Sequence, residues 1–251
     1  MNIIKNLSPY GICGVLGFIC GILYLYWICN KKNFSFDTII YIYVWSALGA
    51  IAGAKLLYLI LQFPAIINYL LHHKIRLDDI LSILNGGFIF YGGLIGATVM
   101  ILISCKYFNQ NTGQVFSIMT PALPLAHAFG RIGCSIVGCC YGKKVTSHFG
   151  IMYKHSKYAP NGIYLFPIQI IEALGDIFIF ILLIYLITHT RYKENILSIY
   201  LTFYALLRFF LEFFRGDVIR GFLWILSTSQ WISAGILLIL LLLKFRQSFH
   251  S

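Results

Sequence analysis

Long apolar runs, separated by short polar stretches, dominate this chain of 251 residues. A helix needs about 20 apolar residues to cross the hydrocarbon core of a membrane. Runs of roughly this length occupy residues 10–29, 38–62, 86–105, 115–140, 166–188, 196–214 and 222–243. We therefore predict an all-α fold, a polytopic membrane helix bundle with about seven transmembrane helices. We expect residues 1–251 to form a single integral membrane domain.

Two stretches depart from this simple pattern. Residues 115–140 are interrupted by prolines and glycines: Pro121, Pro124, Gly130, Gly133 and Gly138. We expect this fourth span to be broken, and broken backbone at membrane depth needs protein or water around it. Residues 63–84 mix isoleucine and leucine with histidine, lysine, arginine and aspartate. That mixture is typical of an interfacial helical segment lying in the headgroup plane.

Composition excludes an ordinary soluble domain. Hydrophobic residues make up 59% of the chain and charged residues 11%, whereas a soluble domain carries about 25% charged residues. The first apolar run is too long for a secretory signal, and Lys31 and Lys32 follow it, so we expect it to be retained. The net charge of +11 fits either binding of an anionic lipid headgroup or anchoring at the interface.

Arg131 lies among glycines, cysteines and apolar residues of the fourth span. A guanidinium at membrane depth is costly unless it faces the bundle interior or a wet cavity, so it indicates a functional site. His127 precedes it by one helical turn and would share its face. The imidazole is either a base or a hydrogen-bonded packing group.

A second charged cluster lies near the end of the sixth run. Arg208, Glu212 and Arg215 are spaced four and three residues apart, so a continuous helix would place them on one stripe. The carboxylate of Glu212 would then hold both guanidiniums, and the two arginines could grip a phosphodiester. The alternative is a buried ion-pair network that ties helices together.

Further polar groups lie at membrane depth or at its edge. They are Lys55, Glu172, Asp176 and Gln230. Residues 85–96 add paired glycines at the start of the third span, which either let an anion approach the backbone or allow two helices to pack closely. Together these groups predict a polar cavity inside the bundle.

Three of the seven cysteines, Cys134, Cys139 and Cys140, follow Arg131 within two helical turns. A nearby cation would favour their thiolates. The spacing C-x4-C-C lacks the paired C-x2-C of usual zinc sites and the C-x-x-C of thiol oxidoreductases. The alternatives are a zinc site, which this spacing disfavours, and close helix packing by small residues. We expect no metal and no cofactor.

Several segments, taken in order, carry a resemblance to a known family. They are Tyr10-Gly11, Gly53-Ala54-Lys55-Leu56-Leu57-Tyr58, residues 85–96, Gly130-Arg131-Ile132-Gly133, Pro167 to Glu172, Arg208 to Asp217, and Gln230. In this order they resemble the motifs of the prolipoprotein diacylglyceryl transferase family, and the match runs nearly end to end. The histidine of that family's third motif is Tyr91 here.

The resemblance implies transfer of the diacylglyceryl group from phosphatidylglycerol to the thiol of a lipoprotein signal-peptide cysteine, with release of glycerol phosphate. It implies a multi-pass protein of the bacterial plasma (inner) membrane whose active site faces the outer leaflet. The partners would be phosphatidylglycerol and the prolipoprotein signal peptide, and no nucleic acid.

The same resemblance suggests roles for individual residues. Arg131 and Arg208 would supply electrostatic catalysis, and Tyr91 or His127 would stand for the family's imidazole. Substrate binding would fall to a larger set: Tyr10, Lys55, Gly92, Gly93, Gln169, Glu172, Glu212, Arg215 and Gln230.

Two other functions are compatible with the same residues. A paralogous transferase could use phosphatidylglycerol with a different acceptor, such as a glycan or a small peptide. A non-enzymatic lipid binder or transporter would favour inverted half-repeats, which the sequence does not show.

Overall fold

The computed structural model describes residues 8–72, 87, 89–146, 149–189, 195–217 and 222–249. Its helices are α1 (Pro9–Lys32), α2 (Phe36–His72), α4 (Phe90–Tyr107), α5 (Thr112–Met119), α6 (Ala122–Val137), α7 (Ile168–His189), α8 (Ile196–Leu211), the 3-10 turn η3 (Glu212–Phe214) and α9 (Thr228–Phe249). Two antiparallel hairpins pair β1 (Ile151–Met152) with β2 (Tyr164–Leu165) and β3 (Phe222–Leu223) with β4 (Leu226–Ser227). The prediction of an all-α polytopic membrane bundle is confirmed.

The apolar runs form the membrane helices because every backbone polar group must be satisfied internally in lipid. Within the described residues, five helices are long and apolar enough to cross a membrane, namely α1, α2, α7, α8 and α9. The helix α4 is a shorter apolar helix. The fourth span is broken as expected, because α5 ends at Met119 and α6 begins at Ala122, just after Pro121.

Two element boundaries differ from the sequence prediction. The last span begins at Thr228 rather than at residue 222, because residues 222–227 form the β3–β4 hairpin with Trp224 in the left-handed region at φ 61°. In addition, α2 does not end at residue 62 but continues through Pro64 to His72. Proline is tolerated within membrane helices because other groups can satisfy the backbone groups that it leaves free. The rest of the expected interfacial segment, residues 73–84, lies outside the described residues.

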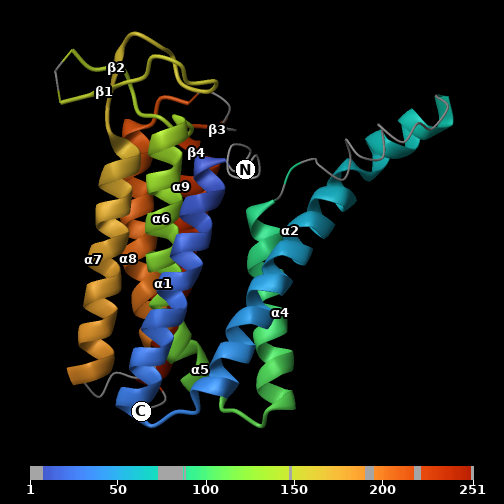
Figure 1. Cartoon of the computed structure of the whole chain (residues 1–251), viewed down its shortest axis with the longest axis vertical. Helices are drawn as coiled ribbons and strands as arrows, with labels where there is room; N and C mark the ends of the chain where they lie inside the picture. Colours follow the sequence, from blue (N-terminus) through green and yellow to red (C-terminus); the bar gives the residue numbers. More distant parts are fainter. Residues whose placement is uncertain are drawn as a thin grey trace, which may run out of the picture. The chain divides into compact units, whose positions relative to one another are not determined.

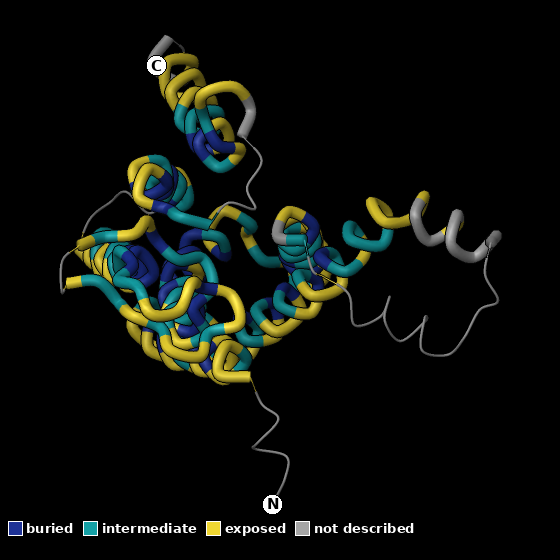
Figure 2. Tube along the Cα trace, turned by 90° about the horizontal axis from the view of Figure 1, so that it is seen from above, coloured by how far each residue is buried: buried dark blue, intermediate teal, exposed yellow. Residues whose placement is uncertain are grey.

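The chain divides into two compact units, residues 1–28 with 116–251 and residues 29–115. The expectation of a single domain stays a prediction. In the first unit, α1, α6, α7 and α8 lie side by side and α9 packs against α8 (Figure 1). Buried positions line the inside of this bundle (Figure 2), and Leu183, Ile168, Ala128 and Ala205 are almost fully buried there.

Glycine contacts hold the second unit together, where α2 and α4 cross. A Cβ atom added at Gly53 would overlap the carbonyl oxygen of Gly92, and one at Gly96 would overlap that of Gly49. Small residues spaced in this way let two helix backbones approach closely in a membrane. Gly92 and Gly96 therefore serve helix packing.

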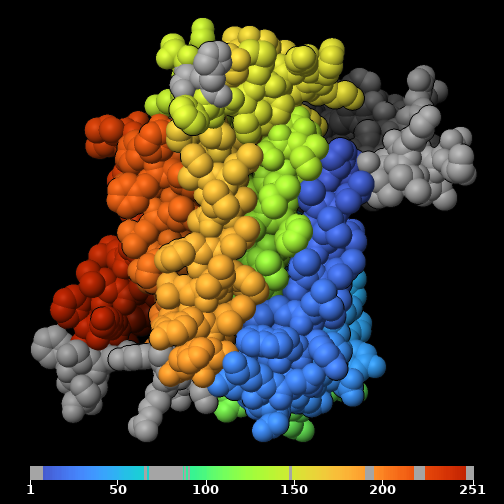
Figure 3. Space-filling view, turned by 60° about the vertical axis from the view of Figure 1, so that its left-hand side comes forward, coloured from blue at the N-terminus to red at the C-terminus, as the bar shows by residue number. Residues whose placement is uncertain are grey.

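The segment after α6 covers one end of the first unit (Figure 3). The Tyr153 hydroxyl donates to the Ser135 carbonyl at 2.8 Å, and the Ser156 hydroxyl donates to the Val137 carbonyl at 2.9 Å. Further on, the Lys143 amide donates to the Phe214 carbonyl at 2.9 Å. These bonds tie the segment to the end of α6 and to the chain that follows α8.

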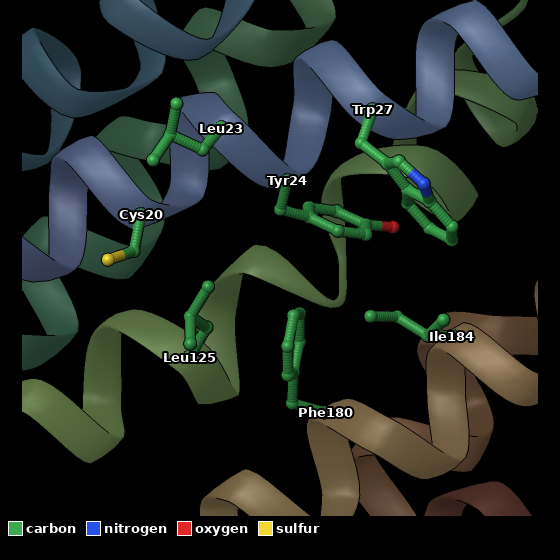
Figure 4. A pocket seen from close by; sticks show the side chains of 7 residues that line it. All are labelled: Cys20, Leu23, Tyr24, Trp27, Leu125, Phe180 and Ile184. Carbon is green, nitrogen blue, oxygen red and sulfur yellow. The ribbon is translucent and has the colours of Figure 1, made fainter.

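An apolar groove runs along α1, α6 and α7 (Figure 4). Its volume is about 470 Å³, and its lining residues are Cys20, Leu23, Tyr24, Trp27, Leu125, Phe180 and Ile184. The Tyr24 hydroxyl points away into the bundle and donates to the Ile118 carbonyl at 3.1 Å. The groove surface is therefore apolar, as is ordinary for a wall that faces lipid.

Candidate functional site

Two arginines from different helices meet at one carboxylate. Arg131 Nη2 of α6 lies 3.0 Å from Glu172 Oε1 of α7, and Arg208 Nη1 of α8 lies 3.6 Å from the same oxygen. The Glu172 side chain is 2% exposed, and the two arginine side chains are 13% and 11% exposed. The two buried guanidiniums therefore converge, with Glu172 between them.

Local structure explains why these groups face one another. Glu172 and Asp176 are four residues apart in α7, so both lie on one stripe, which is turned inward toward α6 and α8. Both carboxylates are buried, as are Gln169 and Ile179 on the same helix. A buried carboxylate is costly unless it is paired; Arg131 and Arg208 pair Glu172, and His127 lies against Asp176. Glu172 Oε1 and both Asp176 oxygens nonetheless make no hydrogen bond among the described residues.

Arg208 is held from a second side by Glu212. Its Nη2 lies 2.9 Å from Glu212 Oε2 and donates to Ser229 Oγ of α9 at 3.4 Å. The single helical stripe expected for Arg208, Glu212 and Arg215 does not form, because α8 ends at Leu211 and the chain continues as a 3-10 turn into extended backbone at Arg215. The predicted pair of Arg208 and Glu212 at helical spacing is therefore confirmed, whereas the predicted extension of this stripe to Arg215 was wrong.

Arg215 instead forms a two-pronged pair with Asp217. Its Nε donates to Oδ1 and its Nη2 to Oδ2, both at 3.1 Å. The pair is buried, with Arg215 7% exposed. The fork of a guanidinium matches a carboxylate in this arrangement, which fixes the direction of the third arginine.

Two of the three arginines keep an unused donor. Arg131 Nε and Arg215 Nη1 are buried nitrogens that have no hydrogen-bond partner among the described residues. Arg208 Nη1 also makes no hydrogen bond there, but it lies 3.6 Å from Glu172 Oε1. A buried unsatisfied donor costs about 1–3 kcal/mol, and more when it is charged. Carboxylates thus hold one edge of each guanidinium, while Arg131 and Arg215 each retain an N–H that can bond an anionic group.

His127 is held by a buried acid. Its Nδ1 lies 3.1 Å from Asp176 Oδ2, and the Asp176 side chain is fully buried while the imidazole is 26% exposed. The Tyr204 ring meets the imidazole edge-to-face at 5.3 Å between centroids. A carboxylate on Nδ1 fixes the ring and leaves Nε2 as the second polar atom, which is the arrangement of an oriented base.

Three other predicted residues lie at the same end of the first unit. Gln230 in the first turn of α9 donates from Nε2 to the Phe209 carbonyl at 3.4 Å and accepts from the Ser227 amide at 3.0 Å. Gln169 donates from Nε2 to the Cys139 carbonyl at 2.9 Å. Tyr10 lies beside α6, since a Cβ atom on Gly133 would come within 3.2 Å of its Cα.

Tyr153 completes the polar contacts at this end. Burial raises the pKa of its phenol above the ordinary value, so the hydroxyl remains a donor. It bonds the Ser135 carbonyl and lies 3.5 Å from Gln169 Nε2. The segment after α6 is thereby linked to both α6 and α7.

The remaining predicted residues belong to the second unit. Lys55 Nζ lies 4.9 Å from the centre of the Tyr58 ring, and Tyr91 is 46% exposed in the first turn of α4. Gly92 is packed against Gly53, and the Gly93 amide donates to the Ile89 carbonyl at 3.2 Å. The suggested roles of Tyr91, Gly92, Gly93 and Lys55 in catalysis or binding stay predictions.

Asp176 was predicted to line the polar cavity, but its contact with His127 was not predicted. The signal was present in the chain, because an aspartate four residues after Glu172 in an apolar run indicates an inward-facing pair. Tyr204 and Ser229, which contact His127 and Arg208, carried no such signal.

The apolar helices and the buried arginine–carboxylate cluster define an integral membrane protein with a charged site inside its bundle. Residues 2–246 match the family described as prolipoprotein diacylglyceryl transferase. This chain belongs to that family and is a multi-pass bacterial membrane protein.

Relatives support the assignment over most of the chain. The phosphatidylglycerol–prolipoprotein diacylglyceryl transferase of Clostridium tetani is 35% identical over 89% of this chain and 86% of its own length. A protein of Clostridium perfringens, named as transferase 2 of the same kind, is 32% identical over 93% and 88%. The Finegoldia magna transferase is 31% identical over 95% and 91%.

Proposed function

We propose that this protein transfers the diacylglyceryl group of phosphatidylglycerol to the thiol of a cysteine in a lipoprotein signal peptide. Its family and the names of its relatives support this reaction. The observation that carries the proposal is the meeting of Arg131 and Arg208, from α6 and α8, at the buried Glu172. Two oriented guanidiniums, together with the unused Nε donor of Arg131, suit one phosphate group.

The charge change in the reaction explains the need for these arginines. The peptide sulfur forms a bond to the glycerol carbon of the diacylglyceryl group as the bond from that carbon to the phosphate oxygen breaks. The phosphodiester carries one negative charge, whereas the departing glycerol phosphate carries a second one and takes the bonding electron pair. Donors aimed at the oxygen where this charge develops stabilise the transition state more than the bound lipid.

The thiol also has to lose its proton, because the thiolate is the real nucleophile. We assign this step to His127, whose ring is fixed by Asp176 at 3.1 Å and contacted by Tyr204. The imidazole Nε2 would accept the proton. Asp176 then acts as a positioning residue, since its contact with Nδ1 orients the ring.

We further propose that the site opens toward the outer leaflet of the plasma (inner) membrane. The beginning of α1, the end of α6 and the segment after α6 lie at one end of the first unit (Figure 1). Arg131 lies in the second half of α6, and Arg208 lies in the last turn of α8. The segment after α6 exposes Lys143, Lys144, Lys154 and Lys157. Lysines near a membrane surface attract anionic headgroups, which concentrates phosphatidylglycerol at this end.

Purified protein in lipid vesicles tests the proposal directly. Phosphatidylglycerol labelled in its diacylglyceryl part would be incubated with a peptide that contains the lipoprotein cysteine. The expected result is label joined to the peptide through a thioether, with one glycerol phosphate released for each modified peptide. A peptide with serine in place of that cysteine is the matched control and stays unlabelled.

Two outcomes would overturn the proposal. If glycerol phosphate were released while the cysteine peptide stayed unlabelled, the acceptor would be a different molecule. If the donor lipid remained chemically intact with every peptide, the protein would be a lipid binder rather than an enzyme.

A further inference from the structure

Three cysteines that the proposed reaction does not use lie together at the end of α6. The Sγ atoms of Cys134, Cys139 and Cys140 all lie within 4.8 Å of one another. All three are free thiols in the structure, with Cys134 buried and the other two partly exposed. The spacing of these cysteines in the sequence argued against a metal site. It does not show that the three sulfur atoms lie close together in the fold.

A tight turn brings the thiols together. Gly138 caps α6 in the left-handed conformation at φ 84°, and its amide donates to the Cys134 carbonyl at 2.8 Å. Cys140 also adopts a positive φ of 56°. These two residues with positive φ reverse the direction of the chain, so that Cys139 and Cys140 lie close to Cys134.

The turn is fixed by its neighbours. A Cβ atom on Gly138 would overlap Ser156, whose hydroxyl bonds the Val137 carbonyl. Gln169 of α7 donates to the Cys139 carbonyl at 2.9 Å, and the Gly216 amide donates to the Tyr141 carbonyl at 3.0 Å. The thiols are therefore held before any ligand arrives, as a preformed binding site requires.

We propose that Cys134, Cys139 and Cys140 form a three-thiolate site for a thiophilic divalent cation of the zinc class. In a tetrahedral zinc site the metal–sulfur distance of about 2.3 Å places sulfurs about 3.8 Å apart. The observed limit of 4.8 Å needs only a small closure of the turn. Three protein ligands are typical of sites that take water or another group as the fourth ligand.

The surrounding charge suits such a complex. Three thiolates with one divalent cation carry a single net negative charge, and Arg131 and Arg215 interact electrostatically with Cys140. All three ligands lie in the turn after α6, so the cation would stabilise that turn, and the chain that follows it is bonded to the segment around Arg215. The inference does not depend on the proposed transfer reaction.

Cadmium binding to the full-length protein in detergent micelles tests the site without lipid or peptide. Reduced, metal-stripped protein would be titrated with Cd²⁺ and followed by the ultraviolet thiolate-to-cadmium charge-transfer band. We expect one Cd²⁺ per chain. We also expect bound Cd²⁺ to protect Cys134, Cys139 and Cys140 from alkylation, as read from the modified peptides.

Variants give a second readout. Cys139→Ser is expected to weaken Cd²⁺ binding more than about 10-fold, since even outer-shell partners contribute that much. Cys20→Ser, which changes a free cysteine of the apolar groove, is the matched control and should bind as the unmodified chain does. The proposal is overturned if the unmodified chain gives no thiolate-to-cadmium band, if protection falls on other cysteines, or if Cys139→Ser binds equally well.

Discussion

Replacing Arg131 with lysine tests the geometry of the site while keeping its charge. The guanidinium uses Nη2 to hold Glu172 at 3.0 Å, and its buried Nε has no partner among the described residues. An ammonium is a point charge on a flexible stem and cannot hold Glu172 and a phosphate oxygen in one rigid plane. The substitution therefore removes one oriented donor to the leaving group.

The size of the effect follows from known losses of single donors. Removing one donor aimed at developing negative charge costs about 2.7–4 kcal/mol, or about 10²–10³-fold in kcat. Because the second negative charge exists only as the phosphate departs, the loss should fall mainly on kcat. The effect on KM should be smaller, since Arg208 and the lysine charge still attract the headgroup.

Initial rates of diacylglyceryl transfer, measured over a range of phosphatidylglycerol contents in vesicles, separate the two parameters. Arg246→Lys is the matched control, because it makes the same change at an exposed position near the end of α9. It should leave both parameters unchanged. If Arg131→Lys kept its kcat within about twofold, which corresponds to well under 1 kcal/mol, Arg131 would have no part in the mechanism.

Three further outcomes follow from the structure. His127→Ala should lower the transfer rate about 10²–10⁴-fold, as expected for the loss of a general base, and should remove the acid limb of the pH–rate profile. An unchanged profile would mean that His127 only packs within the bundle. Glu172→Gln should lower the free energy of unfolding in micelles by about 3–5 kcal/mol, because two buried guanidiniums lose their shared carboxylate; an unchanged thermal midpoint would contradict this. Gly53→Ala should destabilise the protein by about 1–3 kcal/mol through overlap with Gly92, whereas Gly14→Ala, which meets nothing within 4 Å, should not; equal midpoints would contradict the packing.

Some features of the site were readable in the chain because they depend on local chemistry. Arg131 stood out as a charge in an apolar span, and the prolines and glycines around it predicted the break between α5 and α6. Other features depended on where a helix ends. Arg215 left the stripe of Arg208 because α8 stops at Leu211, and a repeating pattern of residues does not fix that end.

The sequence by itself determined the class of this protein. Apolar runs of membrane length must become helices, since lipid offers no partner for backbone N–H and C=O groups. Only the tertiary structure decided which charged groups meet. Glu172 lies between Arg131 and Arg208, and Asp176 lies against His127, because three helices pack side by side. The apolar pattern of one segment predicts that this segment is a helix, but it does not predict which other segment the helix contacts. Those contacts depend on how the helices pack and on the turns between them.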